Sequence, residues 1–153
     1  MSKLQARNEI IIATNVSVIW SVITDINLFP RINTGVVKVT GRMDRQGEKR
    51  TCEIINKGKR GVITERLIEL IPQSRTVWTI ENDTMGMAKM VKDTRFVFEL
   101  HKISEEKTRV VSDTYYVPAN FIAGIMNRIM MRRMFKNVQA SILNNMKSLI
   151  ENR

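Results

Sequence analysis

Apolar and polar residues follow a helical period near the start of the chain, after one short apolar run. Residues 9–13 contain the run Ile-Ile-Ile and predict a first strand. Asn15 then offers an N-cap, and apolar residues follow it at helical spacing: Val16, Ile19, Trp20 and Ile23. Residues 28–32, with Pro30 near their start, predict a second short helical turn.

From Val36 onward the apolar positions recur every second residue, which is typical of strands with one buried face. Turns separate these segments, and the region 82–90, with Met85, Met87 and Met90, is expected to be a loop. The predicted strands include residues 36–39, 52–54, 62–70, 76–81, 94–100 and 109–117. Consecutive strands with short connections predict an antiparallel sheet.

A long helix is predicted from Pro118–Asn120 to the C-terminus. Its second half carries one apolar stripe, which we expect to face the sheet: Met131, Phe135, Val138, Ile142, Met146 and Leu149. The element order predicts one α+β domain over residues 1–153. In it, a curved antiparallel sheet of about seven strands wraps around the long C-terminal helix, and two short helices follow the first strand.

The first half of this helix carries a second apolar stripe, rotated away from the first: Ile122, Met126, Ile129 and Met130. Basic residues lie beside it: Arg128, Arg132, Arg133 and Lys136. In a straight helix the strip within Ile122–Lys136 would face away from the core. It would then suit an anionic membrane, a homodimer contact or a partner protein. The alternative is that residues 118–130 form a separate helix or kinked lid with its own packing.

Composition limits the classes of protein. A chain of 153 residues suits one domain, and its net charge of +10 concerns partners rather than fold. The only cysteine, Cys52, excludes an intramolecular disulfide and indicates a reducing compartment. We find no apolar segment of the kind found in signal peptides or membrane-spanning helices, so a cytoplasmic location is expected. Nucleic acid is not expected as a partner, because the basic segments contain few exposed aromatics and no known motif.

Several segments together resemble the START / Bet v 1-like superfamily, also called SRPBCC or helix-grip. The opening carries an apolar strand at Ile10–Ala13, then Val18–Trp20, Thr24–Ile26 and Phe29–Pro30. Further matches are Ile63–Glu65 after a glycine turn and Tyr116–Pro118 entering the last helix. Within the superfamily the chain is similar to the polyketide cyclase/dehydrase and lipid transport group. The resemblance implies a helix-grip fold, with a cavity for apolar ligands between sheet and helix.

Binding, and possible transport, of a small hydrophobic molecule is therefore the leading hypothesis, with a lipid, quinone or polyketide-like compound as the ligand class. The residues expected to line or guard the cavity are Trp78, Met90, Phe96, Phe98, Phe121, Met131, Phe135 and Val138. No cofactor is implied. No metal site is expected, because one histidine and one cysteine do not make a ligand cluster.

Two other functions stay open. A cyclase or dehydratase would need an inward acid or base, for which the candidates are Asp113 and Tyr115, with Arg66 as a charge stabiliser. Most other strand carboxylates are expected to point outward: Glu53, Glu65, Glu81 and Glu99. The third hypothesis is a protein-interaction domain that uses the C-terminal helix.

Overall fold

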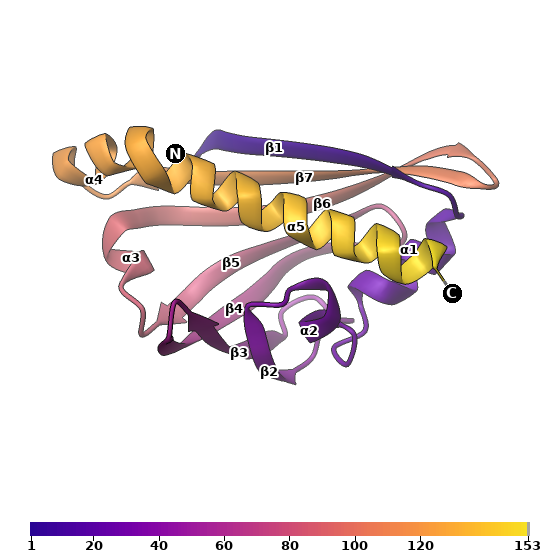
Figure 1. Ribbon diagram of the computed structural model, residues 1–153, viewed down its shortest axis with the longest axis horizontal. Coiled ribbons are helices and arrows are strands. Elements are labelled where there is room, and N and C mark those ends of the chain that lie inside the picture. The colour runs from indigo at the N-terminus through magenta and orange to yellow at the C-terminus, as the bar shows by residue number, and fades with distance from the viewer. Residues whose placement is uncertain (153) are drawn as a thin grey trace.

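One antiparallel sheet forms the body of the protein (Figure 1). The computed structural model describes residues 1–152, so Arg153, the end of the predicted domain, lies outside the described residues. The seven strands are ordered β1-β7-β6-β5-β4-β3-β2. Their bounds are β1 Lys3–Ile12, β2 Val36–Gly41, β3 Lys49–Asn56, β4 Lys59–Ile71, β5 Arg75–Asp83, β6 Val91–Ser104 and β7 Lys107–Pro118.

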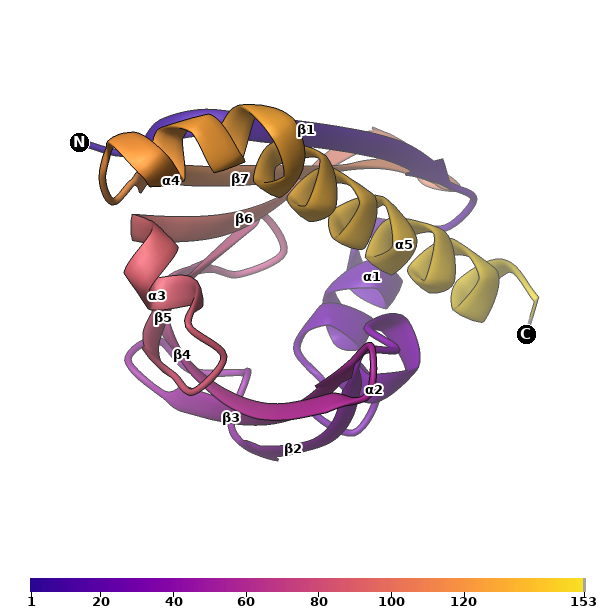
Figure 2. The same cartoon turned by 60° about the vertical axis from the view of Figure 1, so that its left-hand side comes forward.

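A long C-terminal helical segment crosses the concave side of the sheet (Figure 2). It comprises α4 Phe121–Met126, a π-helical turn η1 Asn127–Met131 and α5 Arg132–Glu151. Two short helices, α1 Val16–Ile23 and α2 Phe29–Ile32, lie between β1 and β2 in the chain, and α3 Met87–Met90 lies between β5 and β6. The α+β architecture with a curved sheet and a long C-terminal helix is confirmed.

Two boundaries differ from the sequence prediction. Strand β1 begins at Lys3, well before residue 9, because Lys3 pairs with Tyr116 in the β7 ladder and carries the polar N-terminal residues into the sheet. Residues 87–90 form a helical turn, not a loop. The carboxylate of Asp83 stabilises this turn, since it accepts hydrogen bonds from the backbone N–H groups of Met85 at 2.7 Å and Ala88 at 2.8 Å.

The core consists of two clusters on the concave side. The larger cluster packs α1, α2 and the C-terminal half of α5 against the sheet, and includes Ile12, Ile19, Leu67, Leu143 and Met146. The smaller cluster lies at the start of the long helix and contains Val91, Tyr116, Met131 and Phe135. Phe96 packs against both clusters and therefore marks the boundary between them.

The π-helical turn keeps one side of the long helix against the sheet. Its buried residues recur at intervals of four: Ala123, Asn127, Met131, Phe135 and Gln139. In an uninterrupted α-helix each interval of four advances by about 40°, so this row would drift by roughly 160°. The Arg132 N–H instead donates to the Asn127 carbonyl, five residues earlier. This wider turn accommodates one extra residue and reverses most of the drift.

We predict that two glycines with positive φ respond differently to alanine. Gly41 has φ of 111°, and a Cβ there would lie 2.1 Å from the Lys49 carbonyl oxygen. Gly47 has φ of 90° and open space around a Cβ. We expect Gly47→Ala to lower the free energy of unfolding by about 1 kcal/mol through strain alone. Gly41→Ala should cost roughly 3 kcal/mol, because the β3 backbone must also move. Urea midpoints measure both effects, and equal losses would contradict the steric explanation.

Candidate functional site

The side of the sheet that faces α5 is fixed by contacts from β6 and β7. The Ser112 hydroxyl donates to the Gln139 side-chain oxygen on α5 at 2.8 Å. The Phe96 ring centroid lies 5.9 Å from that of Phe135, also on α5. Even-numbered residues of both strands therefore point into the groove between sheet and helix. Phe96 and Phe98 remain partly exposed on this face, between the two core clusters.

Two polar groups on this concave face have no partner. The Asn8 side-chain nitrogen and the Thr114 hydroxyl are buried without a hydrogen bond. Asn8 pairs with Ser112 in register, and Thr114 pairs with Ala6, so both belong to the patch beside Gln139. An unsatisfied buried polar group costs about 1–3 kcal/mol. In register, Ser112 and Thr114 of β7 also lie opposite Phe98 and Phe96 of β6, so the two unpaired groups are near these partly exposed rings.

An ion pair is buried at the α2 end of the same face. Arg50 on β3 donates from Nε to a Glu65 carboxylate oxygen on β4 at 2.5 Å, and both side chains are largely buried. The guanidinium Cζ lies 4.0 Å from the Phe29 ring centroid and 3.9 Å from that of Trp78. The planar cation is therefore held between two aromatic rings. A flat guanidinium can stack on both rings, which a lysine ammonium cannot do as well.

Neither the thiol nor the phenol on the concave face is available as a base near neutral pH. Burial raises the pKa of Cys52 to about 12 and that of Tyr116 also to about 12. The Tyr116 hydroxyl donates to the side-chain oxygen of Asn127, whose amide donates to Gln5 at 3.1 Å. Tyr116 thereby anchors the π-helical turn to the sheet.

Most of the residues predicted to line the groove lie on the concave side. Trp78, Met131 and Phe135 are buried there, and Phe96 and Phe98 are partly accessible. Met90, on α3, packs half-buried against the smaller core cluster. These residues come from β5, α3, β6 and the long helix.

Phe121 and Val138 require correction. Their side chains are 83% and 42% exposed, so they lie outside the groove. Val138 is one position, about 100° of helix rotation, away from Gln139, which takes the sheet-facing place. Because Gln139 is polar, the apolar pattern of the sequence did not include it in the sheet-facing stripe and pointed to Val138 instead. Phe121 begins α4, where Ala123 is the buried residue.

The candidate acid–base residues also require correction, because the structure places them on the outer face of the sheet. Asp113 is 2% exposed, but its two oxygens accept from Arg7 Nε at 2.7 Å and Nη2 at 2.8 Å. Tyr115, two residues on in the same strand, points to the same side. Arg66 bonds the Glu81 carboxylate through Nε at 2.8 Å. The ion pair with Arg66, supported by Lys49, lowers the pKa of Glu81 to about 2.

The prediction that Glu65 points outward is also wrong, because its side chain lies on the concave face. Its neighbour Arg66 takes the outer face, so the alternation of β4 turns Glu65 inward to Arg50. The sequence signal was weak, because a charged residue in an alternating strand normally faces solvent. A pair of opposite charges directly across β3 and β4 was the signal that could have revealed it.

Further candidate sites in the described residues would be a metal site, a membrane-spanning helix or a depression outside the groove. Among residues 1–152 no group of three or more His, Cys, Asp or Glu side chains is placed to hold a metal ion. No helix in that range is long and apolar enough to cross a membrane. Two shallow depressions lie outside the groove. One is at the β3–β4 hairpin, and the other is beside the N-terminus, where Arg95 and Tyr115 contribute.

Comparison with known families gives one match over nearly the whole chain. Residues 3–151 match the family described as polyketide cyclase / dehydrase and lipid transport. No curated protein sequence matches the chain significantly.

Solved structures with the same fold include proteins of different activities. The Zhui aromatase/cyclase from Streptomyces sp. R1128 has a TM-score of 0.80 and 18% identity, covering 100% of this chain and 96% of its own. Norcoclaurine synthase from Thalictrum flavum, in complex with dopamine and hydroxybenzaldehyde, has a TM-score of 0.77 and 12% identity, covering 100% and 88%. A START superfamily protein from Mycobacterium smegmatis has a TM-score of 0.70 and 10% identity, covering 96% and 97%. At these identities the likeness establishes the fold.

We predict strong coupling between Arg50 and Glu65. Glu65→Leu leaves a buried guanidinium without its carboxylate and should lower the free energy of unfolding by about 3–5 kcal/mol. Arg50→Met should lower the free energy of unfolding by a similar amount, since it leaves the buried Glu65 carboxylate without its positive partner. The double variant should be more stable than either single variant, because both charges leave together. Urea unfolding of the wild type, the two single variants and the double variant gives a double-mutant cycle. If the losses of the two single variants simply add up in the double variant, the coupling is contradicted.

We predict that Cys52 is chemically inert in the folded protein. With a thiol pKa of about 12, only roughly one molecule in ten thousand carries a thiolate at pH 8. Iodoacetamide should therefore label Cys52 slowly in buffer and rapidly in concentrated urea, as followed by intact mass. Rapid labelling without urea would show that the thiol is accessible.

Proposed function

Because the chain belongs to the polyketide cyclase / dehydrase and lipid transport family, we propose that it binds a small, largely apolar molecule with an oxygen function in the groove between the sheet and α5. The observation that carries this proposal is the unpaired Thr114 hydroxyl beside the unpaired Asn8 amide, next to the accessible Phe96 and Phe98 rings. A lipid, quinone or polyketide-like compound has this combination of chemistry.

The proposed ligand divides its contacts between two surfaces. Its apolar part packs on Phe96 and Phe98, where removal of apolar area from water contributes roughly 25 cal/mol per Å². Its carbonyl or hydroxyl oxygen accepts a hydrogen bond from Asn8 Nδ2 or from the Thr114 hydroxyl. These polar contacts fix the orientation of the ligand, while the aromatic contacts supply most of the affinity.

Binding is favoured over catalysis because the ionisable groups described at the groove are already engaged. Arg50 and Glu65 bond each other, and the Tyr116 hydroxyl donates a hydrogen bond to the Asn127 side-chain oxygen. The carboxylate proposed for acid–base work, Asp113, is bound by Arg7 on the opposite face. We place this binding activity in the cytoplasm, where a free thiol such as Cys52 persists.

We predict opposite effects of Thr114→Val on stability and on binding. Valine has the shape of threonine without the hydroxyl, so the ligand-free protein should gain about 1 kcal/mol in free energy of unfolding. Loss of one hydrogen bond should weaken ligand binding roughly fivefold. Native mass spectrometry of protein from its own host, followed by denaturing extraction, identifies the ligand. Titration of the extracted compound into ligand-free protein then measures the affinity.

Thr108→Val is the matched control. The Thr108 hydroxyl is equally buried but donates to the Thr14 carbonyl at 2.9 Å, so this variant should lose stability and keep its affinity. A protein that purifies without a bound molecule and whose Thr114→Val variant gains no stability would overturn the proposal.

A further inference from the structure

A row of large apolar side chains faces solvent on the long helix. We call it the α4 face, and its members are Phe121, Ile122, Ile125, Ile129, Met130 and Met134. Phe121, Ile122 and Ile129 are 83%, 71% and 67% exposed. Isolated exposed apolar residues are ordinary, but a contiguous group of this size on a monomer marks an interaction surface.

Helix geometry gathers these residues on one side. Ile122, Ile125 and Ile129 are separated by three and four residues, which places them on the same helix face. Met130 and Met134 continue the row across the π-helical turn. Of the four residues in the strip singled out from the sequence, Ile122, Ile129 and Met130 face solvent, whereas Met126 packs against the smaller core cluster.

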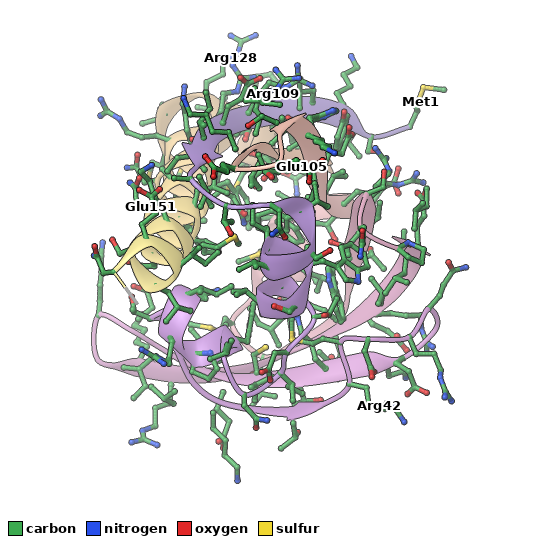
Figure 3. The ribbon with its side chains drawn as sticks, turned by 90° about the vertical axis from the view of Figure 1, so that its right-hand side faces the viewer. Met1, Arg42, Glu105, Arg109, Arg128 and Glu151 are labelled. Carbon is green, nitrogen blue, oxygen red and sulfur yellow. The ribbon has the colours of Figure 1, made fainter. Side chains whose placement is uncertain are left out.

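The charge around the α4 face has one sign. Residues 114–150 contain five basic residues and no acidic one. Arg128, Arg133 and Lys136 are exposed within or beside the apolar row. Arg128 projects outward from the surface of the molecule (Figure 3). An amphipathic helix with an apolar row and a basic border binds the surface of an anionic membrane, where the apolar residues enter the lipid and the basic residues meet the headgroups.

We propose that the α4 face docks on an anionic lipid bilayer. A second copy of the chain fits this surface less well, because a two-fold contact would bring Arg128, Arg133 and Lys136 of each copy together. A phospholipid surface provides both acyl chains for the isoleucines and negative charge for the arginines.

The α4 face lies at one particular end of the molecule, next to α3. Figures 1 and 2 show α3 and α4 at the same end of the molecule. Met87 and Met90 of α3 pack in the cluster that contains Met126 and Met131 of the long helix. The accessible Phe96 touches that cluster as well. A bilayer against α4 therefore meets the end of the protein where flexible methionine side chains of α3 and the long helix pack together.

Vesicle binding tests the proposal without any groove ligand. The wild-type protein should co-sediment with vesicles of phosphatidylcholine mixed with phosphatidylglycerol, and binding should weaken with added salt. Arg128→Gln with Arg133→Gln should reduce the partition coefficient roughly twenty-five-fold, at about fivefold for each charge. Ile125→Ser with Ile129→Ser should also abolish most binding. A Phe121→Trp variant should show a blue shift in tryptophan fluorescence on mixed vesicles.

Matched controls come from the opposite end of the molecule, at the β6–β7 hairpin. Ile103 is 52% exposed and Lys107 is exposed, so Ile103→Ser and Lys107→Gln change the same chemistry away from the α4 face. Both should bind like the wild type. Because all the altered side chains are exposed, the variants should keep the wild-type circular dichroism spectrum.

Several results would overturn the inference: no binding to the mixed vesicles, equal losses in the hairpin controls, or a dimer that Ile129→Ser dissociates while vesicles are not bound. Capture of an acidic protein by the α4 face without vesicle binding would likewise assign the surface to another partner. A ligand-free groove affects none of these measurements, so failure of the proposed function and failure of membrane docking are separable.

Discussion

The buried ion pair between Arg50 and Glu65 holds together the end of the fold on which the groove depends. Its four contributing residues come from β3, β4, β5 and α2, with Phe29 and Trp78 on either side of the guanidinium. The α2 helix is in turn bonded to α5, through the Asn145 amide and the Ile32 carbonyl at 2.9 Å. The Arg50 guanidinium is therefore connected, through Phe29 and the rest of α2, to the helix that crosses the sheet.

The middle of the concave face combines partly exposed aromatic rings with unpaired polar groups. Large hydrophobic clusters pack both ends, and between them Phe96 and Phe98 remain accessible while Asn8 and Thr114 lack partners. A protein selected for stability alone would place apolar side chains at these two polar positions. Retaining polar groups there, at a cost in folding free energy, is typical of a site whose partner arrives from outside.

The sequence predicted the fold well because apolar periodicity determines which face of each element is buried. Alternation placed Phe96 and Phe98 correctly, since every second residue of their strand is apolar. The same reasoning failed where a buried residue is polar or charged. Arg50 and Glu65 resemble surface residues until their pairing across two strands is known. Gln139 likewise hid the sheet-facing stripe of α5 and led to Val138 instead. Hydrogen-bond partners far apart in the chain decide such cases, and periodicity does not contain them.

The π-helical turn divides the long helix into two parts with independent orientation. Deletion of one residue between Asn127 and Met131 would restore a regular α-helix and rotate α4 by about 100° about its axis, while α5 kept its place on the sheet. Relatives that differ by one residue here would therefore present a different side of α4 to their surroundings around the same groove. A length change in this segment is thus a simple evolutionary route to a new docking preference.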